Sequence, residues 1–67
     1  MTDTTKLKAI IAGKGVKQSY LADKLGISRQ AFSNKINNKA PFQLTEIKTI
    51  CETLKINKSE CFNIFLM

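Results

Sequence analysis

The sequence is short of several residue types, and each shortage excludes a class of protein. Among its 67 residues it has no histidine, no tryptophan, one proline, three glycines and two cysteines. Without histidine the chain has no imidazole base, no histidine-ligated metal and no Ser/His/Asp or Cys/His catalytic arrangement. Two cysteines are too few for a disulfide-stapled mini-protein or a four-cysteine zinc site. Paired carboxylates and a glycine-rich phosphate loop are missing as well, so no enzyme, catalytic residue, cofactor or metal site is expected.

Long apolar runs and an N-terminal leader are also missing. The longest apolar stretches are a few residues, far below the ~20 that span a bilayer. The start Met-Thr-Asp-Thr-Thr has neither the basic flank nor the apolar core of a signal peptide. We therefore expect a cytoplasmic protein with no membrane segment. In that reducing compartment Cys51 and Cys61 are expected to be two small buried hydrophobes.

The length allows one domain, residues 1–67, close to the size at which a single core is barely sufficient. Apolar residues make up 43% of the chain, which is too many for a disordered polycation. No second domain for sensing a ligand is apparent, so we expect no small-molecule ligand. Regulation would then come through concentration, oligomerisation or a partner.

Acidic residues are scarce, and the positive excess is confined to one part of the chain. The formal net charge is +6. Residues 1–15 hold three lysines and one aspartate, residues 16–40 hold five cations and one aspartate, and residues 41–67 hold three of each sign. A one-sided basic balance suggests a polyanionic partner, although lysine also commonly covers a solvated helix face.

Apolar residues recur at helical spacing along nearly the whole chain, and no segment alternates with a period of two. Asp3 or Thr4 can cap the first helix, Gly26 can end the second and Ser28 can cap the third. Gln43 is a poor cap for the fourth helix, although Glu46 suits its first turn. The fold class is therefore all-α, with five short helices at about residues 4–13, 18–25, 29–37, 44–54 and 58–65.

The segment at about residues 18–37 predicts a helix-turn-helix, because its apolar residues fit two short helices that meet at a tight turn. Ala22 is small where the following helix crosses close over it, and Gly26 allows the reversal without a Cβ clash. The larger apolar residues of the segment are expected to face inward: Leu21, Leu25, Ile27 and Phe32.

Polar residues of the second helix in this segment share one face. At about 100° per residue, five of them fall within an arc of about 140°: Arg29, Gln30, Ser33, Asn34 and Asn37. Arginine can bond guanine O6 and N7, and glutamine or asparagine can bond adenine N6 and N7. A polar helix face is usually only solvated, so the position of this arc after Leu-Gly-Ile-Ser is what favours DNA contact.

This stretch resembles the helix-turn-helix of the Cro/lambda-repressor type family in the pattern Gln18-x-x-Leu21-Ala22-x-x-Leu25-Gly26-Ile27-Ser28-x-x-x-Phe32-Ser33. Pro41-Phe42 and the Leu44–Leu54 stripe resemble the family's fourth helix, so the likeness covers about residues 5–65. It implies a lambda-repressor-like DNA-binding domain that usually works as a dimer on a pseudo-palindromic operator. Base reading is then expected at Arg29, Gln30, Ser33 and Asn34.

A second set of residues is predicted to contact phosphates. Gln18 begins a helix whose N-terminus should point at the DNA backbone, where its amide and free N–H groups can bind one phosphate. The other candidates are Lys17, Ser28, Lys35, Asn38 and Lys39. For Lys35 and Lys39 a solvated position is almost equally expected, and Tyr20 either touches the backbone or covers the first helix. The family often has a capping Ser or Thr in place of Lys17, so the second helix is less well capped here or is capped in another way. It often has an apolar residue in place of Lys35, which leaves undecided at which residue the third helix ends.

Five of the last six residues are apolar, which is more than one side of a short helix buries in a single core. We expect Phe62 and Phe65 to face the monomer core and Ile64 to lie exposed. The tail and the last helix, about 58–65, are then predicted to form a homodimer interface of Phe62, Ile64, Phe65, Leu66 and Met67. The alternative is a C-terminus folded back on its own core.

The sequence thus predicts a transcription regulator, repressor or Cro-like, that binds double-stranded DNA sequence-specifically through its third helix. Its expected setting is the bacterial cytoplasm, at the nucleoid, with a bacterial or phage gene. The alternative is an antitoxin-like or accessory module in which the same fold mainly holds a protein partner. Salt-dependent binding to random duplex would separate the two.

Overall fold

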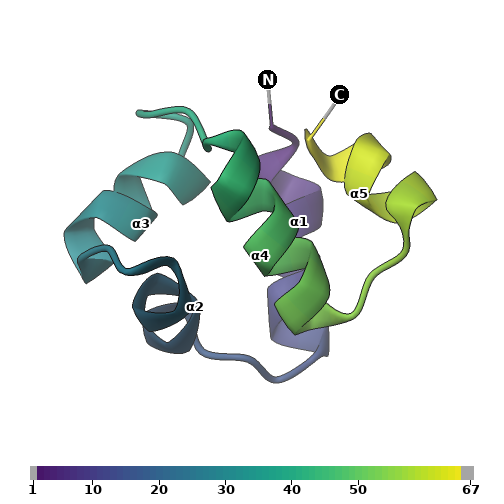
Figure 1. Cartoon of the computed structure of the whole chain (residues 1–67), viewed down its shortest axis with the longest axis horizontal. Coiled ribbons are helices and arrows are strands. Elements are labelled where there is room, and N and C mark those ends of the chain that lie inside the picture. Colours follow the sequence, from purple (N-terminus) through teal and green to yellow (C-terminus); the bar gives the residue numbers. More distant parts are fainter. Residues whose placement is uncertain (1, 66–67) are drawn as a thin grey trace.

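A computed structural model describes residues 2–65 and contains five helices. They are α1 (Thr4–Gly13), α2 (Gln18–Leu25), α3 (Arg29–Ile36), α4 (Leu44–Leu54) and α5 (Lys58–Phe65). Helices α2 and α3 lie at one end of the molecule and α5 at the other, with α1 and α4 between them (Figure 1). The all-α, five-helix prediction is confirmed, with α3 ending one residue earlier than expected. Within residues 2–65, no helix is long and apolar enough to cross a membrane.

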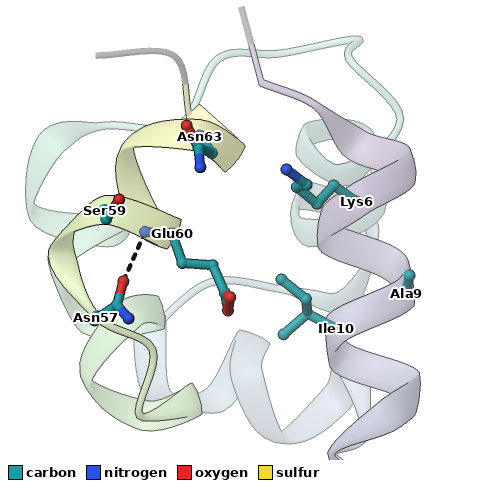
Figure 2. Close-up of a pocket in the computed structure, with 7 residues that line it drawn as sticks. All are labelled: Lys6, Ala9, Ile10, Asn57, Ser59, Glu60 and Asn63. Carbon is teal, nitrogen blue, oxygen red and sulfur yellow. Dashed lines mark hydrogen bonds between the residues drawn. The ribbon is translucent and has the colours of Figure 1, made fainter.

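Local side-chain chemistry sets the helix ends. The Asp3 carboxylate accepts the Lys6 backbone N–H at 3.0 Å and so caps α1. Gly26 ends α2 at φ +70°, the left-handed conformation that a residue without a Cβ adopts most easily. Asn57 Oδ1 accepts the Glu60 N–H at 2.8 Å at the start of α5 (Figure 2).

The core is a single cluster to which all five helices contribute. Its largest fully buried side chains are Phe32, Leu7, Leu21, Ile36, Ile50, Leu54 and Ile64. Phe42, in the loop before α4, packs edge-to-face against both Phe32 and Phe65, with ring centroids 6.1 and 5.6 Å apart. These aromatic contacts tie α3 and α5 to the same loop.

The prediction for the last helix is wrong in its register. Ile64 is fully buried and Phe65 is 4% exposed, whereas Phe62 is 56% exposed. The inward face of α5 therefore follows positions 61, 64 and 65, and the Ile64 carbonyl accepts the Asp3 N–H at 2.6 Å. Within this chain Ile64 and Phe65 offer almost no surface to a second copy. The two other predicted interface residues, Leu66 and Met67, lie outside the described part of the chain.

The two cysteines also differ from expectation. Cys51 of α4 and Cys61 of α5 form a disulfide with a Cα–Cα distance of 6.2 Å, which the prediction of two small buried hydrophobes in a reducing compartment did not include. The reason is tertiary, because the turn between α4 and α5 brings their facing sides together. Both residues pack against the core, as the prediction of small hydrophobes requires.

Candidate nucleic-acid interface

Helix α3 is fixed so that its polar side faces outward. The Ser28 hydroxyl oxygen accepts the Ala31 N–H at 3.0 Å and caps the helix start. Phe32 and Ile36, four residues apart and therefore on one side, are each 1% exposed. Burial of these two side chains, together with the left-handed turn at Gly26, sets the rotation of α3 about its axis.

The four predicted base-reading residues lie on the side of α3 that faces away from the core. Arg29 and Gln30 are exposed, and Ser33 and Asn34 are half-buried. Gln30 Nε2 donates to Asn34 Oδ1 at 3.1 Å. This bond leaves Gln30 Oε1 as an acceptor and Asn34 Nδ2 as a donor, the pair of groups that an adenine edge requires.

A hollow of about 400 Å³ separates this face from the start of α2. It is lined by Gln18, Ser19, Arg29, Gln30, Phe32 and Ser33. Lys17, at the N-cap of α2, makes no side-chain capping bond. Within the described chain the backbone N–H groups of Gln18 and Ser19 have no acceptor. An anion can therefore bind at this helix start, beside the Arg29 guanidinium. The sequence prediction missed Ser19, although its place in the first turn of α2 was a usable signal.

Asn37 is engaged at the end of α3 and is not free to read a base. Its Nδ2 donates to the Ser33 carbonyl at 2.8 Å, and its Oδ1 accepts from Lys8 Nζ at 2.8 Å. The amide thus closes the last turn of α3 and holds a lysine of α1 beside it. Lys8 escaped the sequence prediction because it lies 29 residues away and no local pattern links the two.

The loop after α3 presents two of the predicted phosphate contacts. Asn38 adopts φ +60°, and its Nδ2 donates to the Thr2 carbonyl at 3.3 Å. Lys39 is exposed. Its backbone N–H donates to the Asn34 carbonyl at 2.8 Å, which ties the loop to the polar end of α3. Ser28 and Lys17 are also exposed, so each can reach a ligand on the side of α2 and α3.

Lys35 is the exception among the predicted contacts. Its Nζ pairs with Glu46 Oε1 at 2.6 Å, and the two side chains are only 13% and 10% exposed. Glu46 Oε1 also accepts the Gln43 N–H at 2.8 Å, which gives α4 the cap that Gln43 was not expected to supply. Lys35 is therefore enclosed between α3 and α4 and engaged with Glu46, which differs from both positions expected for it, on a phosphate or in solvent.

The remaining positive charges near α2 and α3 have no carboxylate partner. Within residues 2–65 the Lys35–Glu46 pair is the only ion pair within 4.0 Å. Lys17, Arg29 and Lys39 are all exposed. Lys24 Nζ instead lies 5.4 Å from the centre of the Tyr20 ring, a cation–π contact on the outer side of α2. The surface around α3 is thus positive and uncompensated, as a polyanionic partner requires.

A second, chemically different surface lies between α4 and α5. This apolar groove encloses about 670 Å³, and its exposed apolar side chains are Leu44, 72% exposed, and Phe62. Lys48, Glu52 and Lys58 also line it. The sequence placed Leu44 in the apolar stripe of the fourth helix, but at the first residue of α4 it extends beyond the core.

Comparison with known proteins agrees with this geometry. No curated protein matches the chain. The family model of the Cro/C1-type HTH DNA-binding domain matches residues 6–64, which include α2, α3 and α4 completely and most of α1 and α5. In helix-turn-helix proteins the second helix of the motif lies in the major groove. The chain belongs to the Cro/C1-type helix-turn-helix DNA-binding domain family.

Proposed function

We propose that the protein is a sequence-specific regulator of transcription, of the repressor or Cro type, that reads the DNA major groove with α3. The observation that carries this proposal is the outward face of α3. It combines a guanidinium, a pre-aligned Gln30–Asn34 amide pair and a hydroxyl beside an uncapped helix start. In a bacterial cell such a protein works in the cytoplasm, at the nucleoid.

The individual roles follow from the chemistry of each side chain. Arg29 bonds a guanine, the Gln30–Asn34 pair bonds an adenine, and Ser33 contacts the base between them. The phosphate contacts come from the exposed rim of this face: Gln18, Lys17, Ser28, Asn38 and Lys39. The Ser28 hydroxyl oxygen is used as a cap, but its proton remains free to donate to a phosphate.

We also propose that the protein binds a pseudo-palindromic operator as a homodimer through the apolar groove between α4 and α5. Two recognition helices one DNA turn apart are about 34 Å apart, so each must lie about 17 Å from the two-fold axis. The chain measures 28 × 23 × 20 Å, with α3 and α5 toward opposite ends (Figure 1). A second copy at the α5 end therefore fits this spacing.

The lining of the groove supports a second copy as its occupant. Leu44 and Phe62 supply exposed apolar surface at a site separate from the positive face around α3. Lys48, Lys58 and Glu52 line the same groove, so a two-fold-related copy can place opposite charges against each other. Such a dimer is isologous, with the same patch on both copies.

The test compares wild-type protein with Arg29→Ala on DNA selected from a random pool. The selected site should consist of two inverted half-sites. Loss of the bidentate contact should cost about 1–3 kcal/mol and relax preference at one base pair in each half-site. Lys6→Ala is the matched control, since Lys6 is an exposed cation of α1 that lines neither the hollow beside α3 nor the α4/α5 groove. Unchanged specific binding by Arg29→Ala would show that α3 does not read the groove as proposed.

A second candidate function uses the groove for a different protein. In an antitoxin-like or accessory module, Phe62 and Leu44 would bind a partner chain, and DNA binding would be secondary. The two functions are separated by measuring how tightly the wild-type chain binds random duplex DNA at salt concentrations from about 50 to about 200 mM, a range over which phosphate contacts weaken strongly. A regulator shows affinity that falls steeply with salt, whereas a pure interaction module shows little binding at either concentration.

A further inference from the structure

The disulfide is the feature of this molecule that DNA recognition does not explain. Cys51 and Cys61 are the only cysteines in the chain, and they stand on different helices joined by a three-residue connection, 55–57. Their Cα atoms are 6.2 Å apart, within the range that a disulfide spans without backbone movement. The backbone of the two helices therefore accommodates the bond.

Both cysteines line the apolar groove between α4 and α5, together with the exposed Phe62 and Leu44. Apart from the disulfide, α5 packs against the rest of the protein through its last turn. There Ile64 and Phe65 are buried, and the Asp3 N–H donates to the Ile64 carbonyl. The first turns of α5 carry exposed or half-exposed side chains, including Phe62. The disulfide is thus the covalent bond that fixes this part of α5 against α4.

We propose that Cys51 and Cys61 form a reversible thiol–disulfide site whose oxidised state sets the width of the α4/α5 groove and thereby permits dimerisation. The inference rests on the proposed function for the dimer and for the reducing compartment. Disulfides in reducing compartments are usually transient and redox-sensing, and a cytoplasmic regulator meets glutathione there. The reactant class is a small disulfide of the glutathione type.

The exchange proceeds in two balanced steps. The thiolate of Cys61, the more exposed of the two, attacks one sulfur of the small disulfide, forms a mixed disulfide and releases one small thiolate. The Cys51 thiolate then attacks Cys61 Sγ, forms the protein disulfide and releases the second small thiolate. The protein loses two electrons and its two thiol protons, and the small disulfide gains them to become two thiols. Excess small thiol reverses both steps.

The test equilibrates the full chain over a series of reduced-to-oxidised glutathione ratios and traps free thiols with a maleimide. Both thiols should disappear together, with no mixed disulfide accumulating in the oxidised protein. The thermal midpoint should rise by about 10 °C or more on oxidation, because a closed loop restricts the unfolded chain. In sedimentation, the dissociation constant for self-association should be about tenfold lower in the oxidised form than in the reduced form.

The matched control is the Cys51→Ala/Cys61→Ala double variant, which keeps both positions small and apolar. Its thermal midpoint and self-association should not respond to glutathione and should resemble those of the reduced wild type. The proposal is overturned if the wild-type thiols titrate independently, or if oxidised and reduced wild type associate equally. A redox response that survives in the double variant overturns it as well.

These readouts do not depend on DNA, so the two proposals can fail separately. Redox-insensitive association together with operator binding leaves the regulator intact and removes the switch. Redox-dependent association without any DNA binding removes the regulator and keeps the thiol site.

Discussion

Replacing Lys35 with methionine tests how α3 is held against α4. The change removes the Nζ that lies 2.6 Å from Glu46 Oε1 and leaves the carboxylate with one remaining partner, the Gln43 N–H. Breaking a buried ion pair from one side costs about 3–5 kcal/mol. Both side chains keep some contact with water, so we expect about 3 kcal/mol, at the lower end of that range. For a domain of this size the thermal midpoint should fall by about 12–24 °C.

A second substitution separates the charge from the loss of packing. In Lys35→Met/Glu46→Gln the amide oxygen still accepts the Gln43 N–H, but no uncompensated charge is buried. Its free energy of unfolding should return to within about 1 kcal/mol of the wild type. Lys48→Met is the matched control, an exposed lysine on α4 whose replacement should change stability by less than about 0.5 kcal/mol.

The free energy of unfolding is measured by urea titration followed by circular dichroism for the wild type, Lys35→Met, Lys35→Met/Glu46→Gln and Lys48→Met. The reasoning is refuted if Lys35→Met is no less stable than Lys48→Met, or if the double variant is less stable than Lys35→Met alone. DNA binding supplies an independent check, made at a temperature where both proteins are folded. Since Lys35 is enclosed, the salt dependence of binding should be the same for Lys35→Met as for the wild type. If the salt-dependence slope of Lys35→Met is lower than that of the wild type by about 1, Lys35 does contact a phosphate.

Three further outcomes follow from the structure. Ile64→Ala should lower the free energy of unfolding by about 2–5 kcal/mol in urea titrations, whereas Phe62→Ala should leave it within about 0.5 kcal/mol and weaken self-association in sedimentation. Equal stability losses in the two variants would contradict the observed register of α5. Gly26→Ala should lower the free energy of unfolding by about 1–2 kcal/mol, because an L residue is strained at the left-handed φ of +70° even though its Cβ would meet no atom within 4 Å. An alanine variant as stable as the wild type would argue against the left-handed turn. Lys39→Ala should weaken binding to all DNA sequences alike and lower the salt slope by about 1, and a sequence-dependent loss would speak against a phosphate contact.

Local sequence chemistry was enough to predict the helices and the face of α3. Asp3, Ser28 and Gly26 act within a few residues of themselves, through a cap bond or a backbone conformation, so their positions predict where helices begin and end. The polar arc that begins at Arg29 follows from helical periodicity once Phe32 faces inward. Asn37 was placed in the same arc, but it belongs to the helix end, because the amide can bond the carbonyl four residues earlier.

Tertiary structure decided the features that depend on residues distant in the sequence. Periodicity gives α5 an apolar side, but the packing of Ile64 beside Asp3 and α1 determined which side is buried. A lysine at position 35 looks like a surface cation until α4 places Glu46 against it, since an ion pair between helices has no local pattern. The Cys51–Cys61 bond also depends on tertiary structure. The sequence shows that there are two cysteines, but only the turn between α4 and α5 brings them together. The sequence therefore determined the helix-turn-helix and its polar face, whereas three-dimensional packing decided which charges remain free for DNA and which apolar side chains remain free for a partner.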